Sequence, residues 1–546
     1  MTALPAEEKR LLLRRVQQAA EAQDFGRAIA LARQALESGI EEAMLLNLRA
    51  YWHEIEGRDA ESLADLQWAQ RLAPGEVPVL NALGLAYARL GRMREAIQSF
   101  DSVIVRMPDF APAHFNKGWT SEDIGELDTA RECYERAGEL TPMAPDPAAR
   151  LAALAARLGE WEAARANATR ALAIAPRHPL AIVALARVEV ADRDLAAAER
   201  RLRAMLEHAE LSPADRTLAQ SVLGDLLDAD GRCAEAFAIY AERNRILRSM
   251  HQARFEGPGV ETMPHYVGWF RAYFENSVQP WTQPPSEITK ANGPQRHVFI
   301  LGFARSGTTL LEEVLATDPS VVTTQERDAL SDGVREFLTT PDGLERLSTL
   351  PRAAARRMRE QYWRRIQEFG IEAKDRTLVD KQPFNTMKLP LIARLFPASK
   401  ILFSVRDPRD VILSCFRHQF RMNSSTFEFL TLEGTARLYD AMMQLSDILR
   451  ARLGLDVLQL RHEDLVADFD GQMRAVCAFI GMPWSDTMRD FAAQSGRRAV
   501  ATPSSVQIKR GLNQAGIGQW RHYRAELEPI FPILKPWVDR FGYPAE

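Results

Sequence analysis

The chain has 546 residues, of which 46% are hydrophobic and 26% charged, and its formal net charge at pH 7 is -4. This length allows two or three domains that each bury a core. The charge balance gives no reason to expect nucleic-acid binding, which usually depends on a strongly basic domain. No apolar leader with a cleavage site is found, and no run reaches the ~18 apolar residues that a membrane span needs, so we expect a cytoplasmic location.

The cysteines are few and far apart, at Cys133, Cys233, Cys415 and Cys477. None of them has the CxxC spacing of a zinc site, and the number is small for a disulfide framework. The sequence therefore predicts buried free thiols.

The N-terminal half repeats at an interval of 34 residues. Prolines keep this interval at Pro74, Pro108, Pro142 and Pro176. Glycines keep it at Gly57, Gly91, Gly125 and Gly159. A small residue keeps it at Ala28, Ser62, Ala96, Ala130, Ala164 and Ala198. Small residues let two helices approach closely, glycine turns the chain, and proline ends the second helix, so the pattern predicts stacked helical hairpins.

The best unit, residues 79–108, resembles a tetratricopeptide repeat. The matching positions are Leu83, Gly84, Tyr87, Ala96, Phe100 and Pro108. A further unit follows after a slip of four residues, with Gly224, Gly231, Ala236 and Tyr240. We expect about seven units over residues 8–250, forming an all-α solenoid whose concave face binds a peptide or protein partner or serves only as a scaffold. Residues 251–295 then form a connector to residues 296–546.

A glycine-rich turn at residues 302–307 is the most informative feature of the C-terminal half. Residues 297–311 read HVFILGFARSGTTLL, which predicts a buried strand, a tight turn and a helix whose N-terminus faces an anion. The residues expected to hold a phosphate are Arg305, Ser306, Gly307, Thr308 and Thr309. The GxxxxGK[ST] loop of nucleotide triphosphatases requires lysine where this chain has Thr308, so a P-loop kinase or nucleotidase is the weaker alternative.

The segments after this loop alternate between strand and helix. One strand runs into Lys381 and another covers residues 400–405, each followed by a helical segment. Such alternation predicts an α/β domain with a parallel sheet and helices on both faces.

Six motifs, spread in order over residues 296–545, resemble the sulfotransferases, and most closely the bacterial tetratricopeptide-sulfotransferases and the protein-tyrosine sulfotransferases. The motifs are RSGTTL at the loop, Glu326 at 21 residues beyond Arg305, DKQPFN with IARLFP, VRDPRD with Ser414 eight residues after Arg406, LRHEDL with FIGMPW, and TPSSVQIKRG with GQWRHY. The resemblance implies the sulfotransferase fold and, as co-substrate, 3'-phosphoadenosine 5'-phosphosulfate (PAPS), with no metal required.

The resemblance also implies a role for each matching residue. The loop would hold the 5'-phosphosulfate, and Arg406 with Ser414 would bind the 3'-phosphate. Glu326 would be the general base that deprotonates the acceptor hydroxyl, whereas Lys381, with Arg305, would stabilise charge on the leaving oxygen. Taken singly, each of these residues could instead be a solvated surface residue.

The last motif aligns less closely. Ser505, or its neighbour Ser504, falls where the family has a serine near the bridging oxygen, and Arg510 with Gly511 resembles a late contact to the 3'-phosphate. His462 replaces the usual tyrosine and is expected to pack under the fold rather than to react. A basic stretch at residues 351–366 predicts a solvated helix face or a surface that attracts acidic acceptors.

The sequence thus predicts a sulfotransferase that modifies an acceptor hydroxyl. The acceptor stays open among a peptidyl tyrosine, a small phenol, a sugar and a lipid head group, and so does the oligomeric state. A second alternative, a solenoid adaptor with a non-catalytic nucleotide-binding module, is disfavoured because Arg305, Glu326, Lys381, Arg406 and Ser414 are all present.

Overall fold

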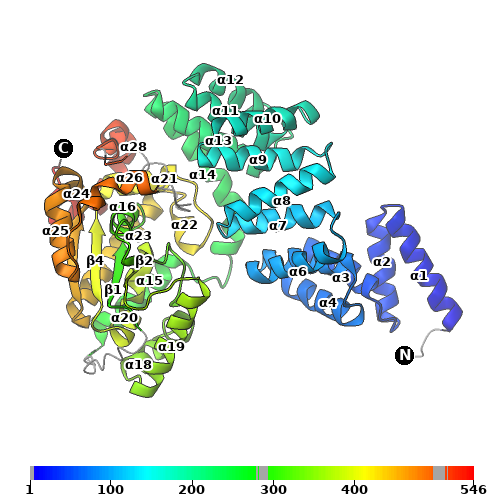
Figure 1. Ribbon diagram of the computed structural model, residues 1–546, viewed down its shortest axis with the longest axis horizontal. Coiled ribbons are helices and arrows are strands. Elements are labelled where there is room, and N and C mark those ends of the chain that lie inside the picture. The colour runs from blue at the N-terminus through cyan, green and yellow to red at the C-terminus, as the bar shows by residue number, and fades with distance from the viewer. Residues whose placement is uncertain (1–4, 278–280, 282–292, 496–510, 513, 546) are drawn as a thin grey trace. The chain divides into compact units, whose positions relative to one another are not determined.

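The computed structural model describes residues 5–277, 281, 293–495, 511–512 and 514–545, and the chain forms two compact units. The first unit comprises Met1–Glu207 and the second His208–Glu546. Figure 1 shows that the first is wholly helical, whereas the second contains a β-sheet covered by helices. This division falls before residue 250, the expected end of the repeats. The last repeat-like helix pair, residues 213–255, belongs to the second unit because it contacts other helices of that unit.

The first unit is a succession of helix pairs, in which each helix packs against the next one along the chain. Its helices are α1 (Ala6–Glu21), α2 (Phe25–Glu37), α3 (Ala43–Ile55), α4 (Asp59–Leu72), α5 (Val77–Arg89), α6 (Met93–Arg106), α7 (Ala111–Asp123), α8 (Leu127–Leu140), α9 (Pro145–Leu158), α10 (Trp161–Ile174), α11 (Pro179–Ala191) and α12 (Leu195–Leu206). These helices confirm the predicted solenoid of helical repeats.

Close approach within a pair depends on the recurring glycine. A Cβ atom on Gly84 of α5 would lie 2.5 Å from the ring of Phe100 on α6. The same contact recurs one repeat later, where a Cβ on Gly118 would lie 2.9 Å from Tyr134. Gly91 joins α5 to α6 with a φ of 74°, a left-handed conformation that glycine adopts without strain. The sequence period therefore reflects helix packing and chain reversal.

The second unit begins with another helix pair and continues into the α/β domain. Its helices are α13 (Pro213–Ala229), α14 (Cys233–Phe255), α15 (Met263–Asn276), α16 (Thr308–Leu315), α17 (Ser331–Phe337), α18 (Pro341–Ser348), α19 (Arg352–Glu368), α20 (Leu389–Leu395), α21 (Pro408–Arg417), α22 (Ser424–Glu428), α23 (Leu432–Leu453), α24 (His462–Ala467), α25 (Phe469–Ile480), α26 (Phe491–Ser495), α28 (Arg524–Leu527) and α29 (Phe531–Arg540). Short 3-10 helices occur at η1 (Pro383–Lys388), η2 (Asp486–Asp490), η3 (Gln519–Tyr523) and η4 (Glu528–Ile530).

The sheet has five parallel strands in the order β2-β3-β1-β4-β5. They are β1 (Arg296–Gly302), β2 (Val321–Thr323), β3 (Thr377–Lys381), β4 (Lys400–Val405) and β5 (Asp456–Arg461). The chain builds one side of β1 and then crosses to the other side between β3 and β4. Open α/β sheets bind ligands outside the carboxyl ends of the strands at such a switch point. The loop at residues 302–307 follows the central strand at this place.

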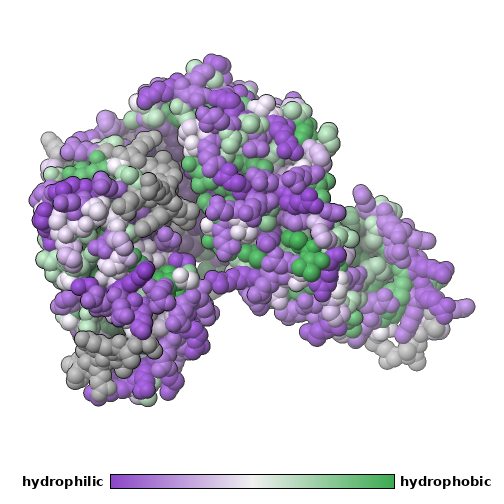
Figure 2. Space-filling model, in the orientation of Figure 1, coloured by the Kyte–Doolittle hydropathy of each residue, from purple (hydrophilic) through white to green (hydrophobic). Residues whose placement is uncertain are grey.

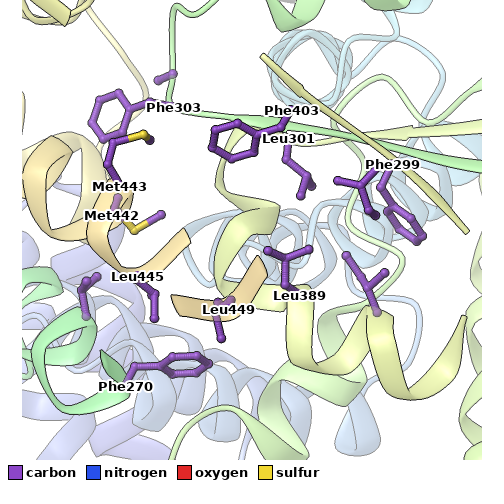
Figure 3. Packing of buried hydrophobic residues seen from close by; sticks show 14 of the residues in the cluster. Phe270, Phe299, Leu301, Phe303, Leu389, Phe403, Met442, Met443, Leu445 and Leu449 are labelled. Carbon is purple, nitrogen blue, oxygen red and sulfur yellow. The ribbon is translucent and has the colours of Figure 1, made fainter. Parts of the chain in front are cut away.

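Residues of the central strands alternate between two apolar cores. Val298, Ile300 and Leu402 contribute to a core with α16 and α25, whereas Phe299 and Phe403 contribute to a larger core with α15, α19, α20 and α23. Figure 3 shows the larger core, in which side chains of β1 and β4 lie above those of α20, α23 and α15. Both faces of the sheet are thus buried, as parallel sheets require.

Helix α15 lies within the segment that the sequence predicts to be a connector. Its Val267, Phe270 and Phe274 are fully buried in the larger core, and the helix packs against α23. In Figure 3 Phe270 lies close to Leu445 and Leu449 of α23. This part of the segment therefore contributes to the stability of the C-terminal unit.

Exposed apolar side chains are scattered among hydrophilic ones on the face shown in Figure 2. Among the helices of the described residues, none is both long and apolar enough to cross a membrane.

Candidate functional site

The loop at residues 302–307 is fixed by close contacts with β4 and with the start of α24. A Cβ on Gly302 would lie 2.5 Å from the carbonyl oxygen of Ser404, so only glycine fits there. The Oγ of Ser404 donates a hydrogen bond of 2.6 Å to the carbonyl oxygen of Ser306. Gly307 has a φ of 93°, and a Cβ on it would lie 2.7 Å from Nδ1 of His462. These contacts hold the loop in one shape before any ligand binds.

Helix α16 begins directly after the loop with a buried N-terminus. Thr308 and Thr309 are 3% and 6% exposed, and the N-cap residue, Gly307, provides no side-chain hydrogen bond to the helix. The first N–H groups of a helix require acceptors, and the positive end of its dipole favours an anion. A buried N-terminus capped by glycine is the arrangement that binds a phosphate or sulfate.

Arg305 points its guanidinium from the loop toward α21. Its Nε donates to Oγ of Ser414 over 2.9 Å, and its Nη2 lies 3.3 Å from Nε2 of His418. The Nδ1 of His418 lies 2.9 Å from the carbonyl oxygen of Ser414, so Nδ1 must carry the proton and Nε2 accepts from Arg305. Burial and the charge of Arg406 lower the pKa of Arg305 to about 10, which leaves it cationic at neutral pH.

A second buried guanidinium, that of Arg406, follows β4. Its Nη1 donates over 3.2 Å to the carbonyl oxygen of Arg305, and its Nη2 donates to that of Gly516. Its Nε is buried and has no hydrogen-bond partner among the described residues. Two cations that repel one another at the same loop are best accommodated by an anion between them.

Lys381, at the end of β3, is fully buried and lies between two carboxylates. Its Nζ lies 3.1 Å from Oε2 of Glu312, donates to Oε1 of Glu326, and is 3.4 Å from Oγ1 of Thr309. Burial opposes the charge of Lys381, but the carboxylates of Glu312 and Glu326 outweigh it and raise the pKa of the lysine. The cation therefore persists beneath the N-terminus of α16.

The two carboxylates differ in their surroundings. Glu312 is buried on α16, and this burial raises its pKa to about 7. The side chain of Glu326 is 37% exposed, so it can reach a molecule in solution. Gln325 and Glu326 have φ values of 50° and 66°, which are uncommon for residues other than glycine and are concentrated at functional sites.

The structure brings six of the predicted site residues together, in two groups, at the carboxyl end of the sheet. Arg305 contacts Ser414 and Arg406, whereas Lys381 contacts Glu326 and Thr309. Their roles in binding and catalysis stay predictions.

The remaining predicted site residues belong to the last motif. Ser504, Ser505 and Arg510 lie outside the described residues. Gly511 is described and has a φ of 76°.

Two neighbours of the site, Glu312 beside Lys381 and His418 beside Arg305, were not predicted from the sequence. His462, for which the sequence predicts a packing role, lies against the loop as a close contact. A signal existed for Glu312, because a carboxylate that directly follows Leu310 and Leu311 in a helix predicted to pack on the sheet implies a buried partner. Nothing in the local sequence of His418 indicates its contact with a loop more than a hundred residues earlier.

Comparison with known proteins assigns both parts of the chain. Residues 296–486 match the model of the sulfotransferase family. They form a sulfotransferase-family domain. Residues 77–104 and 111–142 match the tetratricopeptide repeat, so the sulfotransferase domain follows a repeat array.

Similar proteins include sulfotransferases at low identity. Protein-tyrosine sulfotransferase 2 of Gallus gallus is 25% identical over 265 residues, which cover 45% of this chain and 69% of that protein. An uncharacterized protein of Aquifex aeolicus is 23% identical over 393 residues, which cover 69% of this chain and 48% of that protein, so the match spans about half of that relative's length. A tetratricopeptide repeat protein of known structure from Parabacteroides merdae covers 44% of this chain and 94% of its own, with 13% identity and a TM-score of 0.37.

Proposed function

We propose that the C-terminal unit transfers a sulfuryl group from PAPS to an acceptor hydroxyl. The sulfotransferase-family match supports sulfuryl transfer in general. The finer proposal rests on one observation. The ammonium group of Lys381 is fully buried beneath the loop, and it is bonded to the carboxylate of Glu326, which is open to solvent.

The loop and the two arginines have the properties that the donor requires. The uncapped N-terminus of α16 and the loop amides suit the 5'-phosphosulfate, and Arg406 with Ser414 suits the 3'-phosphate. The Nε of Arg406, which has no partner in the part of the chain that the structure describes, is a further donor for an anion. Bound donor would supply the sulfuryl group and a bisphosphate leaving group.

Glu326 and Lys381 would then act on different groups, the first on the acceptor hydroxyl and the second on the leaving oxygen. Glu326 takes the proton of the acceptor hydroxyl as its oxygen forms a bond to sulfur. The bond between sulfur and the bridging oxygen breaks, and Lys381 stabilises the charge that remains on the leaving oxygen. Arg305 shares this stabilisation of the leaving oxygen from the loop. Because Glu326 is exposed and Lys381 is buried, the acceptor would approach from the side of Glu326 and the donor would lie on the side of Lys381.

The relatives that modify protein tyrosines suggest a phenolic acceptor for this chain as well. A phenol has an ordinary pKa of about 10 and needs a base near neutral pH, which suits the accessible Glu326. The repeat array would bind the protein or peptide that carries the acceptor. Incubation with PAPS and tyrosine peptides, followed by mass spectrometry, tests this proposal. A gain of one sulfuryl group on tyrosine is expected, and magnesium-dependent turnover of ATP without sulfation would contradict it.

A further inference from the structure

Helix α14 places a buried arginine against the end of the helix that carries Ser414. Arg243 is 1% exposed, and its neighbour Asn244 is also 1% exposed. Figure 1 shows α14 following α13 at the start of the C-terminal unit. By its sequence α14 belongs to the last repeat, yet its most deeply buried polar side chains are bonded to the sulfotransferase domain.

The contacts of Arg243 and Asn244 satisfy the last carbonyl groups of α21. The Nη2 of Arg243 donates to the carbonyl oxygen of Phe416 and its Nη1 to that of Arg417, both over 2.8 Å. The amide nitrogen of Asn244 donates to the carbonyl oxygen of Phe416 over 3.0 Å, and its Oδ1 accepts from Nε and Nη2 of Arg243. A buried cation thus lies at the negative end of α21, where it stabilises the helix.

The end of α21 in turn orients the loop arginine. Ser414 lies in the last turn of α21 and His418 directly follows the helix. Both hydrogen-bond to the guanidinium of Arg305, and the ring of His418 is held by the carbonyl oxygen of Ser414. A change in the last turn of α21 would therefore move Ser414 and His418, two acceptors of Arg305, at once.

A second contact from the same helix pair holds the side chain of Arg417. Asp228 of α13 accepts from Arg417 and from the hydroxyl of Tyr523, and Arg417 also donates to Gln519 over 3.1 Å. The segment that contains Gln519 includes Gly516, whose carbonyl oxygen accepts from Arg406. The helix pair α13–α14 is thus linked to the surroundings of both loop arginines.

We propose that Arg243 and Asn244 are positioning residues for the donor site, because they fix the end of α21 on which Ser414 and His418 orient Arg305. The proposal goes beyond the proposed function, and its nucleotide readout rests on that function. The helix pair α13–α14, although its sequence follows the repeat pattern, thus also supports the donor site.

The test uses the full-length chain with Arg243→Met, which keeps the length of the side chain and removes its donors. The matched control is Arg245→Met on the same helix, because Arg245 is exposed and, among the described residues, forms an ion pair with Glu242 alone. Hydrogen exchange without nucleotide should become about tenfold faster for residues 411–419 in Arg243→Met and stay unchanged in Arg245→Met. Unchanged exchange in Arg243→Met would overturn the proposal whether or not the chain is a sulfotransferase.

Affinity for adenosine 3',5'-bisphosphate provides the second readout. Arg243→Met should weaken binding about tenfold, with partial rescue by Arg243→Lys. In the double variant with Ser414→Ala the two losses should be less than additive, because Arg243 acts through the end of α21 that holds Ser414, whereas a general loss of stability would add independently. Full additivity would contradict the positioning role. If Arg243→Met fails to fold, Asn244→Ala takes its place in both measurements. If the unmodified chain does not bind the nucleotide, the proposed function is refuted. The hydrogen-exchange measurement then still decides whether Arg243 has the positioning role.

Discussion

Replacing each carboxylate beside Lys381 by its amide should separate catalysis from stability. Glu326→Gln and Glu312→Gln both keep the shape of the side chain and a hydrogen bond to the same ammonium group. Only Glu326 is open to solvent. We expect Glu326→Gln to lose the general base, with turnover reduced by ~10²- to 10⁴-fold and nucleotide affinity retained.

The expected cost in stability follows from the exposure of each pair. The side chain of Glu326 is 37% exposed, so its ion pair contributes only about 0.2–1 kcal/mol to the free energy of unfolding. This corresponds to a change in Tm of roughly 4 °C or less. Glu312 is 2% exposed beside a fully buried lysine, so Glu312→Gln should cost more, about 1–3 kcal/mol. It should nevertheless keep turnover within about tenfold of the parent chain.

The assay combines thermal unfolding with initial rates on a series of phenols of graded acidity. A more acidic phenol should partly rescue Glu326→Gln and do little for Lys381→Ala, because the lysine acts on the leaving group. Near-normal turnover of Glu326→Gln, or equal losses of turnover in the two amide variants, would show that the base lies elsewhere.

Three further measurements test the site and the unit boundary. Adenosine 3',5'-bisphosphate at ~100 times its Kd should stabilise the C-terminal unit by about 2.7 kcal/mol, and much less in Arg406→Ala or with adenosine 5'-monophosphate; equal thermal shifts for the two nucleotides would refute the 3'-phosphate site. Burial, with the charges of Arg406 and Arg305, lowers the pKa of His462 to about 3, so the unfolded chain binds the extra proton and stability falls as the pH drops from 6.5 toward 3. His462→Gln should reduce that fall by up to about 1.4 kcal/mol per pH unit, and parallel stability curves for variant and parent would count against it. Removal of residues 1–207 should leave nucleotide affinity intact, whereas removal of residues 1–250 should weaken it at least about tenfold, because it takes away Arg243 and Asn244 with α13 and most of α14; equal affinity of both fragments would show that α13–α14 is dispensable.

The sequence was sufficient for the fold because both halves carry local signals. The period of 34 residues arises from contacts inside one helix pair, such as Gly84 against Phe100, and such contacts repeat in the sequence. The alternation of strands and helices likewise reflects neighbouring segments. The predicted solenoid followed by a parallel sheet is therefore confirmed.

The sequence was insufficient for the surroundings of the site. Glu312, His418 and His462 join it through contacts between segments far apart in the chain, which no spacing rule describes. The division at Glu207 has the same origin, because α14 keeps the repeat pattern while Arg243 bonds to carbonyl groups of α21. The resemblance to sulfotransferases indicated which residues to consider but not what holds them in place.

The left-handed backbone at Gln325 and Glu326 has a consequence for protein engineering. A residue with a side chain loses roughly 1–2 kcal/mol in this conformation, and glycine does not. Gln325→Gly should therefore raise the Tm, and a search for heat-resistant variants should find it. The same exchange would free the backbone that aims the carboxylate of Glu326, so selection for heat resistance alone should yield slower catalysts from this position.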